Sequence, residues 1–238
     1  MALSATVARR MAETRSISER LATLPPGRHL VPHDFVVQNQ RERMLLATAE
    51  LVAERGYRRT TIESIAKTAR VALTTFYEHF ESKEECFLAA FDENVDAAAE
   101  VFAELVDPEL DWTEQISTGL EVFLEMVATE TPRATLCLVE SQAAGPAALA
   151  RYQGMLERVA PKLREGRALN PRSARLPEGL EVALAGGIAW LVHQRLVAGE
   201  VAEIKALLPE MLQIALTPYV GEVEAGRAAD AAQARIAA

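Results

Sequence analysis

The sequence predicts an all-α protein. Alanine, leucine and glutamate, three residues that favour helices, are frequent, whereas aromatic residues make up only 5% of the chain. In several segments apolar residues recur three and four positions apart, as they do on one face of an amphipathic helix. Prolines such as Pro108, Pro132 and Pro177 divide the second half of the chain into segments of helical length. Together these observations favour a chain built from helices.

The composition limits the class of protein. The 238 residues are 50% hydrophobic and 25% charged, which excludes wholesale disorder and leaves ample apolar surface for a core. Two cysteines are too few for the disulfide framework of a small secreted domain. The longest uncharged apolar stretch, near Ala183–Val192, is shorter than the roughly 20 residues that span a bilayer. We therefore expect a soluble, cytoplasmic protein with no membrane partner.

Four parts are predicted along the chain. Residues 1–38 are expected to form a partly flexible N-terminal arm, because Pro25-Pro26-Gly27 breaks any helix there. Residues 39–85 are expected to form a first helical domain and residues 86–220 a second. The alanine-rich residues 221–238 are expected to be a flexible tail.

Within the first domain, the helices have the outline of a helix-turn-helix. Apolar periodicity over residues 41–55 predicts a helix, and Gly56 ends it. Either Thr60, in a capping box with Glu63, or Thr61 alone is expected to begin a short second helix. A third, equally short helix is predicted over residues 72–79. Two short helices in close succession are typical of a helix-turn-helix, although many helical bundles contain such helices without binding DNA.

A more specific motif lies in the same region. An Ile65-Ala66 pair is followed, at a set distance, by Tyr77-Glu78-His79-Phe80 and then by Ser82-Lys83-Glu84. With the preceding helix and Gly56-Tyr57, this pattern over residues 39–91 resembles the N-terminal domain of TetR/AcrR transcriptional regulators. The resemblance covers about a fifth of the chain, and the rest of the sequence matches the family only in its helical, acidic character.

The resemblance implies a homodimer that binds a palindromic double-stranded operator, with the third helix of each copy in the major groove. It implies a C-terminal domain that binds a small-molecule effector and dimerises. The effector would change the spacing of the two DNA-reading heads, most often releasing a repressor from its operator and less often acting on an activator.

Ten residues are predicted to contact DNA. Hydroxyl and imidazole groups on a short helix can reach base edges or phosphate oxygens. An ammonium group at the start of the next helix can hold a phosphate together with free backbone N–H groups. For Tyr77, the alternative is a half-buried side chain that packs within the domain. The ten residues are Thr60, Thr61, Arg70, Ala72, Leu73, Thr74, Thr75, Tyr77, His79 and Lys83, whereas Phe76 and Phe80 are predicted to anchor the third helix in the core.

Two positions depart from the pattern that the resemblance implies. Arg70 stands where the family usually has glycine, and a positive φ there would cost arginine about 1 kcal/mol. Ala72 replaces the usual Ser or Thr cap, with a loss of roughly 0.5–2 kcal/mol. Leu73 adds an apolar group suited to a thymine methyl. These residues leave the operator sequence open.

The N-terminal arm allows two interpretations. Arg28 and His29 follow two prolines and are candidates for insertion into a minor groove, as basic arms do. Alternatively, the arm packs on the first helix through Val31, Phe35 and Val36. The sequence does not separate the two.

The second domain is expected to bind the effector and to dimerise. Polar or aromatic groups on otherwise apolar helices are the candidate pocket residues, although plain packing is the alternative for each of them. Two helices with broad apolar surfaces, near residues 182–192 and 207–216, are expected to form a four-helix dimer interface. The pocket candidates are Trp112, Phe123, Glu140, Tyr152, Trp190, His193 and Gln194. The interface candidates are Leu184, Ile188, Leu191, Leu208, Met211 and Leu212.

Other functions have weaker support. The chain has no phosphate-binding glycine-rich loop and no nucleophile elbow, and its four histidines lack metal-ligand spacing, so we expect no enzyme, no cofactor and no metal. Two alternatives stay open, a regulator that senses oxidation through Cys86 or Cys137, and a helical interaction protein that does not bind DNA.

The net charge of −9 is an average over two unlike parts. Residues 1–70 hold 12 basic and 7 acidic side chains, a net of +5, and residues 71–238 hold 13 basic and 27 acidic ones, a net of −14. We therefore expect any contact with DNA to be confined to the N-terminal part.

Overall fold

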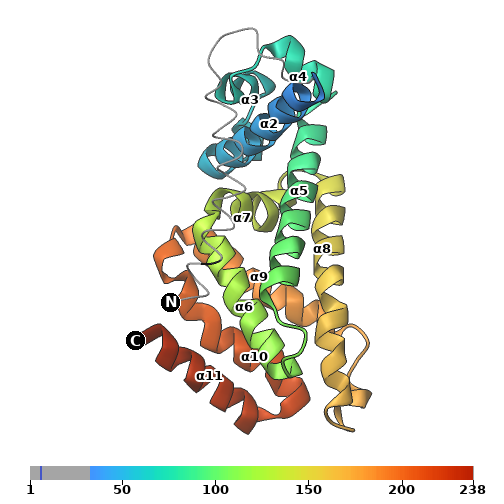
Figure 1. Ribbon diagram of the computed structural model, residues 1–238, viewed down its shortest axis with the longest axis vertical. Coiled ribbons are helices and arrows are strands. Elements are labelled where there is room, and N and C mark those ends of the chain that lie inside the picture. Colours follow the sequence, from blue (N-terminus) through green and yellow to red (C-terminus); the bar gives the residue numbers. More distant parts are fainter. Residues whose placement is uncertain (1–5, 7–32, 238) are drawn as a thin grey trace.

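The computed structural model describes residue 6 and residues 33–237. In this part of the chain every regular element is helical, which confirms the predicted all-α class. Figure 1 shows a small head, made of α2, α3, α4 and the start of α5, above a larger body that contains α6 to α11. The long helix α5 runs from the head down into the body, and α7 lies at the end of the body next to the head.

The α-helices are α2 (His33–Arg55), α3 (Ile62–Ala69), α4 (Leu73–His79), α5 (Lys83–Leu105), α6 (Trp112–Thr129), α7 (Thr131–Leu138), α8 (Pro146–Arg164), α9 (Leu180–Ala198), α10 (Leu208–Val220) and α11 (Glu222–Ala237). Five short 3₁₀ helices join them: η1 (Tyr57–Arg59), η2 (Glu140–Gln142), η3 (Glu165–Ala168), η4 (Ser173–Arg175) and η5 (Val201–Leu207).

The head has a core that it shares with the body. Met44, Ile65 and Phe76, one from each head helix, are fully buried together. Leu136 of α7 and Ala148 of α8 belong to the same apolar cluster. Since two body helices contribute to the core of the head, the head is fixed to the body by packing as well as by the α5 connection.

The first head helix begins earlier than the sequence predicts. It begins at His33 rather than near residue 41, and it therefore includes the last residues assigned to the arm. Phe35, Val36 and Val37 are 36–41% exposed there instead of packing on the helix. The reason is that no proline or glycine interrupts residues 33–55, and Asp34 in the first turn favours helix initiation.

The C-terminal segment also differs from the expected flexible tail, because residues 222–237 form α11. Ala225, Ala229 and Ala232 are at most 2% exposed and follow one another at intervals of four and three residues, so they line one face of this helix. These small side chains let α11 pack closely along α10 (Figure 1). Alanine combines the highest helix propensity with this close approach, and the segment is ordered for both reasons.

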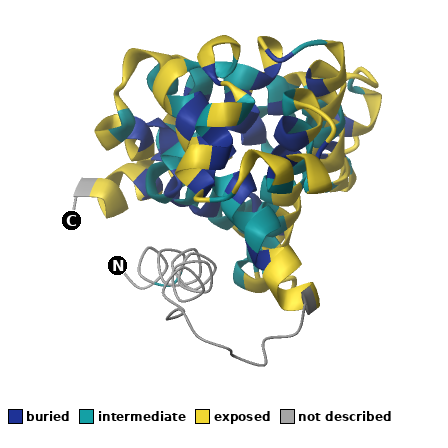
Figure 2. Cartoon of the chain, turned by 90° about the horizontal axis from the view of Figure 1, so that it is seen from above, coloured by how far each residue is buried: buried dark blue, intermediate teal, exposed yellow. Residues whose placement is uncertain are grey.

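The body core is centred on α6, α9 and α10. In the view from above, the buried residues lie inside the molecule and the exposed ones around it (Figure 2). The Trp112 ring meets the Tyr219 ring edge-on at 5.0 Å between centroids, and its Nε1 donates to the carbonyl of Lys162 at 2.9 Å. Gly166 lies under this indole, since a Cβ there would be 2.5 Å from the Trp112 ring.

Candidate nucleic-acid interface

The turn between α3 and α4 is built around Arg70. This residue has φ 55° and ψ 45°, which confirms that the position normally held by glycine is left-handed here. Arg43 of α2 donates from Nη2 to the carbonyl of Arg70 at 2.9 Å and also to the carbonyl of Ala69. These charge-assisted bonds offset the strain, whereas the sequence suggested a phosphate contact by Arg70 itself. The Arg70 side chain is exposed.

The N-terminus of α3 is capped by Thr61 and not by Thr60. The Thr61 hydroxyl accepts from the Ser64 N–H at 3.2 Å, and the Ser64 hydroxyl lies 3.1 Å from the Thr61 N–H, which makes a capping box without Glu63. Thr60 is 1% exposed and donates its hydroxyl to the Gly56 carbonyl at 3.0 Å. The structure therefore leaves Thr61 at the surface and removes the Thr60 side chain from it.

The short helix α4 is held from one side and exposed on the other. Phe76 and Phe80 are at most 3% exposed and anchor it in the head core, as the sequence predicts. Leu73 is 42% and Tyr77 54% exposed, and Thr74 is exposed beside them. Ala72 is the N-cap and makes no side-chain cap bond, whereas Thr75 is half-buried. The exposed face thus carries apolar, hydroxyl and phenol groups.

His79, at the end of α4, is half-buried against the head. Its Nε2 lies 3.5 Å from Oε1 of Gln40, and its ring lies 6.2 Å from that of Phe80. Burial lowers the pKa of His79 below its ordinary value of 6.5. The imidazole is therefore neutral near pH 7 and is suited to hydrogen bonding rather than to charge attraction.

Lys83 faces inward rather than toward solvent. Its Nζ donates to the carbonyls of Tyr57 and Thr60, both at 2.9 Å, and lies 4.1 Å from the centre of the Tyr57 ring. Burial lowers the pKa of this ammonium. The structure thus assigns Lys83 to holding the turn before α3, and the predicted phosphate contact stays a prediction.

Exposed basic residues that the sequence-based set omitted lie around the same helices. Arg58 and Arg59 of η1 and Lys67 of α3 are exposed. For Arg58 and Arg59, the signal in the sequence is that two adjacent arginines directly precede Thr60. Two further candidates, Arg28 and His29, lie outside the described residues.

The seven predicted pocket residues have different environments, and the effector pocket stays a prediction. Trp112 is 8% exposed inside the body core, Trp190 is 52% exposed, and Gln194 is exposed as well. Glu140 accepts from the Tyr57 backbone N–H at 2.7 Å and so belongs to the head–body contact. The other three, Phe123, Tyr152 and His193, are half-buried.

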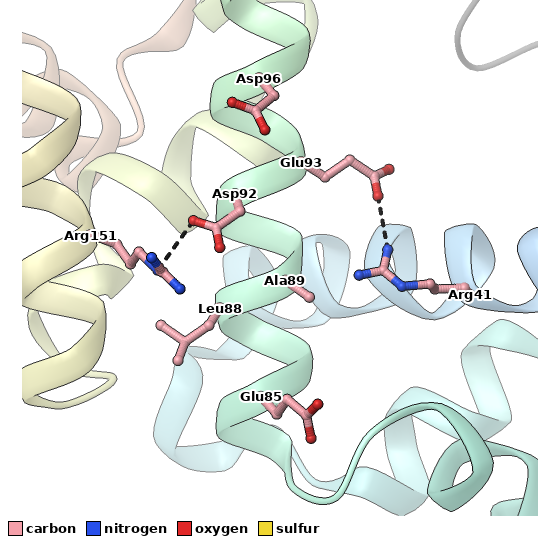
Figure 3. A pocket seen from close by; sticks show the side chains of 8 residues that line it. All are labelled: Arg41, Glu85, Leu88, Ala89, Asp92, Glu93, Asp96 and Arg151. Atoms are coloured by element: carbon pink, nitrogen blue, oxygen red, sulfur yellow. Dashed lines mark hydrogen bonds and ion pairs between the residues drawn. The ribbon is translucent and has the colours of Figure 1, made fainter. Parts of the chain in front are cut away.

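A groove of about 500 Å³ runs along α5, between α2 and α8 (Figure 3). Glu93 points to Arg41 of α2 at 3.3 Å, and Asp92 points to Arg151 of α8 at 3.2 Å. The lining residues are Arg41, Glu85, Leu88, Ala89, Asp92, Glu93, Asp96 and Arg151. The groove has four carboxylates and two guanidiniums, and each guanidinium is paired with one of the carboxylates. The excess negative charge makes the groove unsuited to an anionic ligand.

The predicted dimer residues are mostly engaged within the chain. Leu208, Met211 and Leu212 are at most 3% exposed, because α10 is covered by α6, α9 and α11, and Ile188 is 7% exposed. Leu184 and Leu191 are half-buried. On α9, an exposed residue directly precedes each predicted interface residue in the sequence. The exposed face consists of Ala183, Gly187, Trp190, Gln194 and Val197, which we call the α9 stripe.

Both thiols are buried. Cys86 contacts the Thr48 hydroxyl at 3.2 Å, and Cys137 lies in the same apolar cluster. Burial raises the pKa of Cys86 to about 11 and that of Cys137 to about 12. Since oxidation needs an accessible thiolate, this environment opposes the redox-sensor alternative.

Among the described residues, none forms a group of three or more His, Cys, Asp or Glu side chains suited to a metal ion. No described helix is long and apolar enough to cross a membrane.

Comparison with known proteins supports the interpretation of the head. The sequence model of bacterial regulatory proteins of the tetR family matches residues 44–90. The HTH-type transcriptional regulator TcmR of Streptomyces glaucescens is 37% identical over 93 residues, 38% of this chain and 39% of that protein. The HTH-type transcriptional activator FasR of Mycolicibacterium smegmatis is 27% identical over 88 residues, 37% of this chain and 40% of that protein. The match thus spans about 40% of the length of these curated relatives.

The likeness of fold extends further. The structure of FadR from Bacillus subtilis in complex with stearoyl-CoA superposes with a TM-score of 0.61 at 22% identity, over 76% of this chain and 98% of that one. The matched region contains α3, α4 and the capped start of α5, whose geometry is described above. The head of this chain, residues 44–90, is therefore similar to the N-terminal domain of the TetR family of bacterial regulatory proteins.

Proposed function

We propose that the chain is a transcriptional regulator that binds a palindromic operator as a homodimer, with α4 in the major groove. The observation that supports this is the α4 surface, where Leu73, Thr74 and Tyr77 are exposed while buried Phe76 and Phe80 hold the helix from behind. Direct readout of base edges needs such outward-facing groups on a rigid helix. The exposed Arg58, Arg59, Lys67 and Arg70 supply positive charge for the phosphates.

The experiment that tests this function is selection of duplexes from a random pool by the full chain, followed by affinity measurement on the selected sequence. Tyr77→Ala is expected to weaken binding by about 10- to 100-fold, because one DNA contact contributes roughly 1–3 kcal/mol. Val223→Ala, at a 73% exposed position on α11, is the control and is expected to bind like wild type. Failure to enrich any sequence would leave the interaction-protein alternative.

Dimerisation is proposed to use the α9 stripe. Its members follow one another four, three, four and three residues apart, which is the spacing of a helix–helix seam. Ala183 and Gly187 allow close approach at one end, and Trp190 and Val197, 52% and 64% exposed, supply apolar area at the other. A stripe of this kind suits an isologous contact with a second copy.

The regulator is proposed to be a repressor that a lipophilic small molecule releases from DNA. Half-buried apolar side chains of α6 and α8, such as Phe123, Tyr152 and Met155, border the body core and offer the surface for such an effector. Because the Bacillus subtilis FadR structure contains stearoyl-CoA, acyl-CoA thioesters are the first compounds to test, by thermal shift and by release of DNA.

A substitution at Lys83 separates positioning from phosphate contact. Lys83→Met is expected to lower the free energy of unfolding by about 1–3 kcal/mol, since the Thr60 carbonyl loses its donor and the Tyr57 carbonyl keeps only the N–H of Thr60. If the Lys83 ammonium bonds these carbonyls and no phosphate, the slope of log K against log salt is expected to stay unchanged. Arg59→Ala is the control and is expected to reduce that slope by about 1. An equal reduction in Lys83→Met would restore the phosphate role.

A further inference from the structure

The turn between α2 and α3 is held by the body as well as by the head. Tyr57 donates its backbone N–H to Oε2 of Glu140 at 2.7 Å, while its carbonyl accepts from Lys83 of α5. The Tyr57 ring packs edge-on against Phe87 at 5.1 Å. The backbone N–H and the carbonyl of Tyr57, shortly before α3, thus both have side-chain partners from outside α2 and α3.

The local backbone makes this approach possible. Gly56 has φ 83° and ψ 156°, a conformation open essentially to glycine alone. A Cβ at this position would lie 3.6 Å from Oε2 of Glu140, so the carboxylate is seated directly against the turn. The chain therefore passes Glu140 with its Tyr57 N–H aimed at the carboxylate.

The residues around Glu140 are themselves fixed to α9. Nδ1 of His193 lies 3.0 Å from the carbonyl of Leu138, and the His193 ring stacks on Trp190 at 5.0 Å. The Glu140 carbonyl accepts from the N–H groups of Ala143 and Ala144, which closes the η2 turn. Residues 138–140 thus lie between α9 on one side and the turn before α3 on the other.

From this arrangement we infer that Glu140 is a positioning residue. It fixes the position of the head helices α3 and α4 relative to the α9 stripe. The inference rests on the proposed function. In a dimer that joins through α9, the distance between the two α4 helices depends on how each head is held relative to that seam. Half-site spacing in DNA mirrors this distance. Glu140 therefore controls which spacing the dimer accepts, while α4 reads the bases of each half-site.

The test compares duplexes that differ only in the separation of the half-sites. The selected operator, versions with one base pair fewer or more, and a single half-site are titrated with wild type, Glu140→Ala, Glu140→Gln and Gln142→Ala. Wild type is expected to prefer the selected spacing by about tenfold or more. Glu140→Ala is expected to lose most of this preference, to keep its affinity for the single half-site, and to exchange the Tyr57 amide proton faster.

The other two variants make the result specific. Glu140→Gln keeps an oxygen that can accept from Tyr57 and is expected to retain most of the spacing preference. Gln142→Ala changes an exposed residue of the same η2 turn and is expected to match wild type. A folded Glu140→Ala dimer with the wild-type preference would overturn the inference alone, whereas selection of no duplex by wild type would overturn the proposed function and the inference with it. If Glu140→Ala does not fold, the other two variants decide. A loss of preference in Gln142→Ala, or a Glu140→Gln variant identical to wild type in both spacing preference and Tyr57 exchange, would overturn the inference. A Glu140→Gln variant with a somewhat smaller preference and faster Tyr57 exchange, beside a Gln142→Ala variant that matches wild type, would support it.

Discussion

A Glu181→Ala variant is expected to lose about 3–5 kcal/mol of unfolding free energy, because it removes one partner of a buried ion pair. Glu181 is 0% exposed at the start of α9, and Arg167 donates to it from Nε at 2.6 Å and from Nη2 at 3.0 Å. The Tyr219 hydroxyl also donates to Glu181, at 3.1 Å. Alanine would leave the guanidinium and the phenol without this acceptor in the body core.

Thermal or urea unfolding measures this loss. For a chain of this size, the expected change corresponds to a Tm lower by roughly 6–20 °C. Glu224→Ala is the matched control, because its pair with Arg227 at 3.1 Å is largely exposed and such pairs contribute about 0–1 kcal/mol. A Glu181→Ala variant as stable as the control would show that the pair does not hold the start of α9 to η3.

The same pair predicts a dependence of stability on pH. Hydrogen bonds from Arg167 hold the pKa of Glu181 below its ordinary value of 4.5. The resulting stabilisation is therefore complete above pH 4.5 and is lost as the pH falls through the lower, folded-state pKa. Wild type is expected to lose this part of its stability in acid, and Glu181→Ala has none of it to lose. The difference between the two unfolding free energies should thus narrow as the pH falls below about 4.

The sequence predicted the structure best at positions where the residue type has one structural role, such as burial in the core or capping of a helix. Phe76 and Phe80 follow the periodicity of a core face, and both are buried. Arg70 in a left-handed turn and Ala72 without a cap bond were also predictable, because each stands where the family pattern requires another residue. The TetR resemblance rested on the same short segment, residues 39–91, where local patterning and tertiary structure agree.

The predictions were poorer wherever the outcome depended on distant partners. Glu140 and Lys83 are charged residues at positions that suggested a pocket and a phosphate, yet each bonds to the backbone of the turn at Tyr57, 83 and 26 residues away in sequence. Apolar periodicity identified α10 as a broad apolar helix but gave no sign that α11 covers it. The alanines of α11 resemble a flexible tail until a facing helix is in place to pack against them.

Substituting aspartate for Trp190 is expected to separate the dimer. A large aromatic residue at the centre of a seam typically contributes about 2–4 kcal/mol to binding, so Trp190→Asp should raise the dimer dissociation constant by roughly 30- to 1,000-fold. Trp190 is suited to this role because His193 stacks on it and is itself held at the Leu138 carbonyl, which fixes the indole before the partner arrives. Sedimentation or light scattering over a range of concentrations measures the change.

Two comparisons decide whether the seam is the α9 stripe. Val223→Asp places the same charge at a 73% exposed apolar position on α11 and is expected to leave the dimer intact. Met211→Ala tests the earlier assignment: because Met211 is fully buried within the chain, it should lower the unfolding free energy by about 2–5 kcal/mol without a specific effect on dimerisation.

The DNA affinity of Trp190→Asp connects the seam to the proposed function. A monomer reaches one half-site only, so binding to the full operator should fall to the level measured for a single half-site. Tyr77→Ala should weaken both duplexes alike, because it removes a contact within each half-site. If Trp190→Asp remains a dimer, or if its operator affinity is unchanged, the second copy must dock elsewhere, and the spacing argument for Glu140 would have to be rebuilt on that other face.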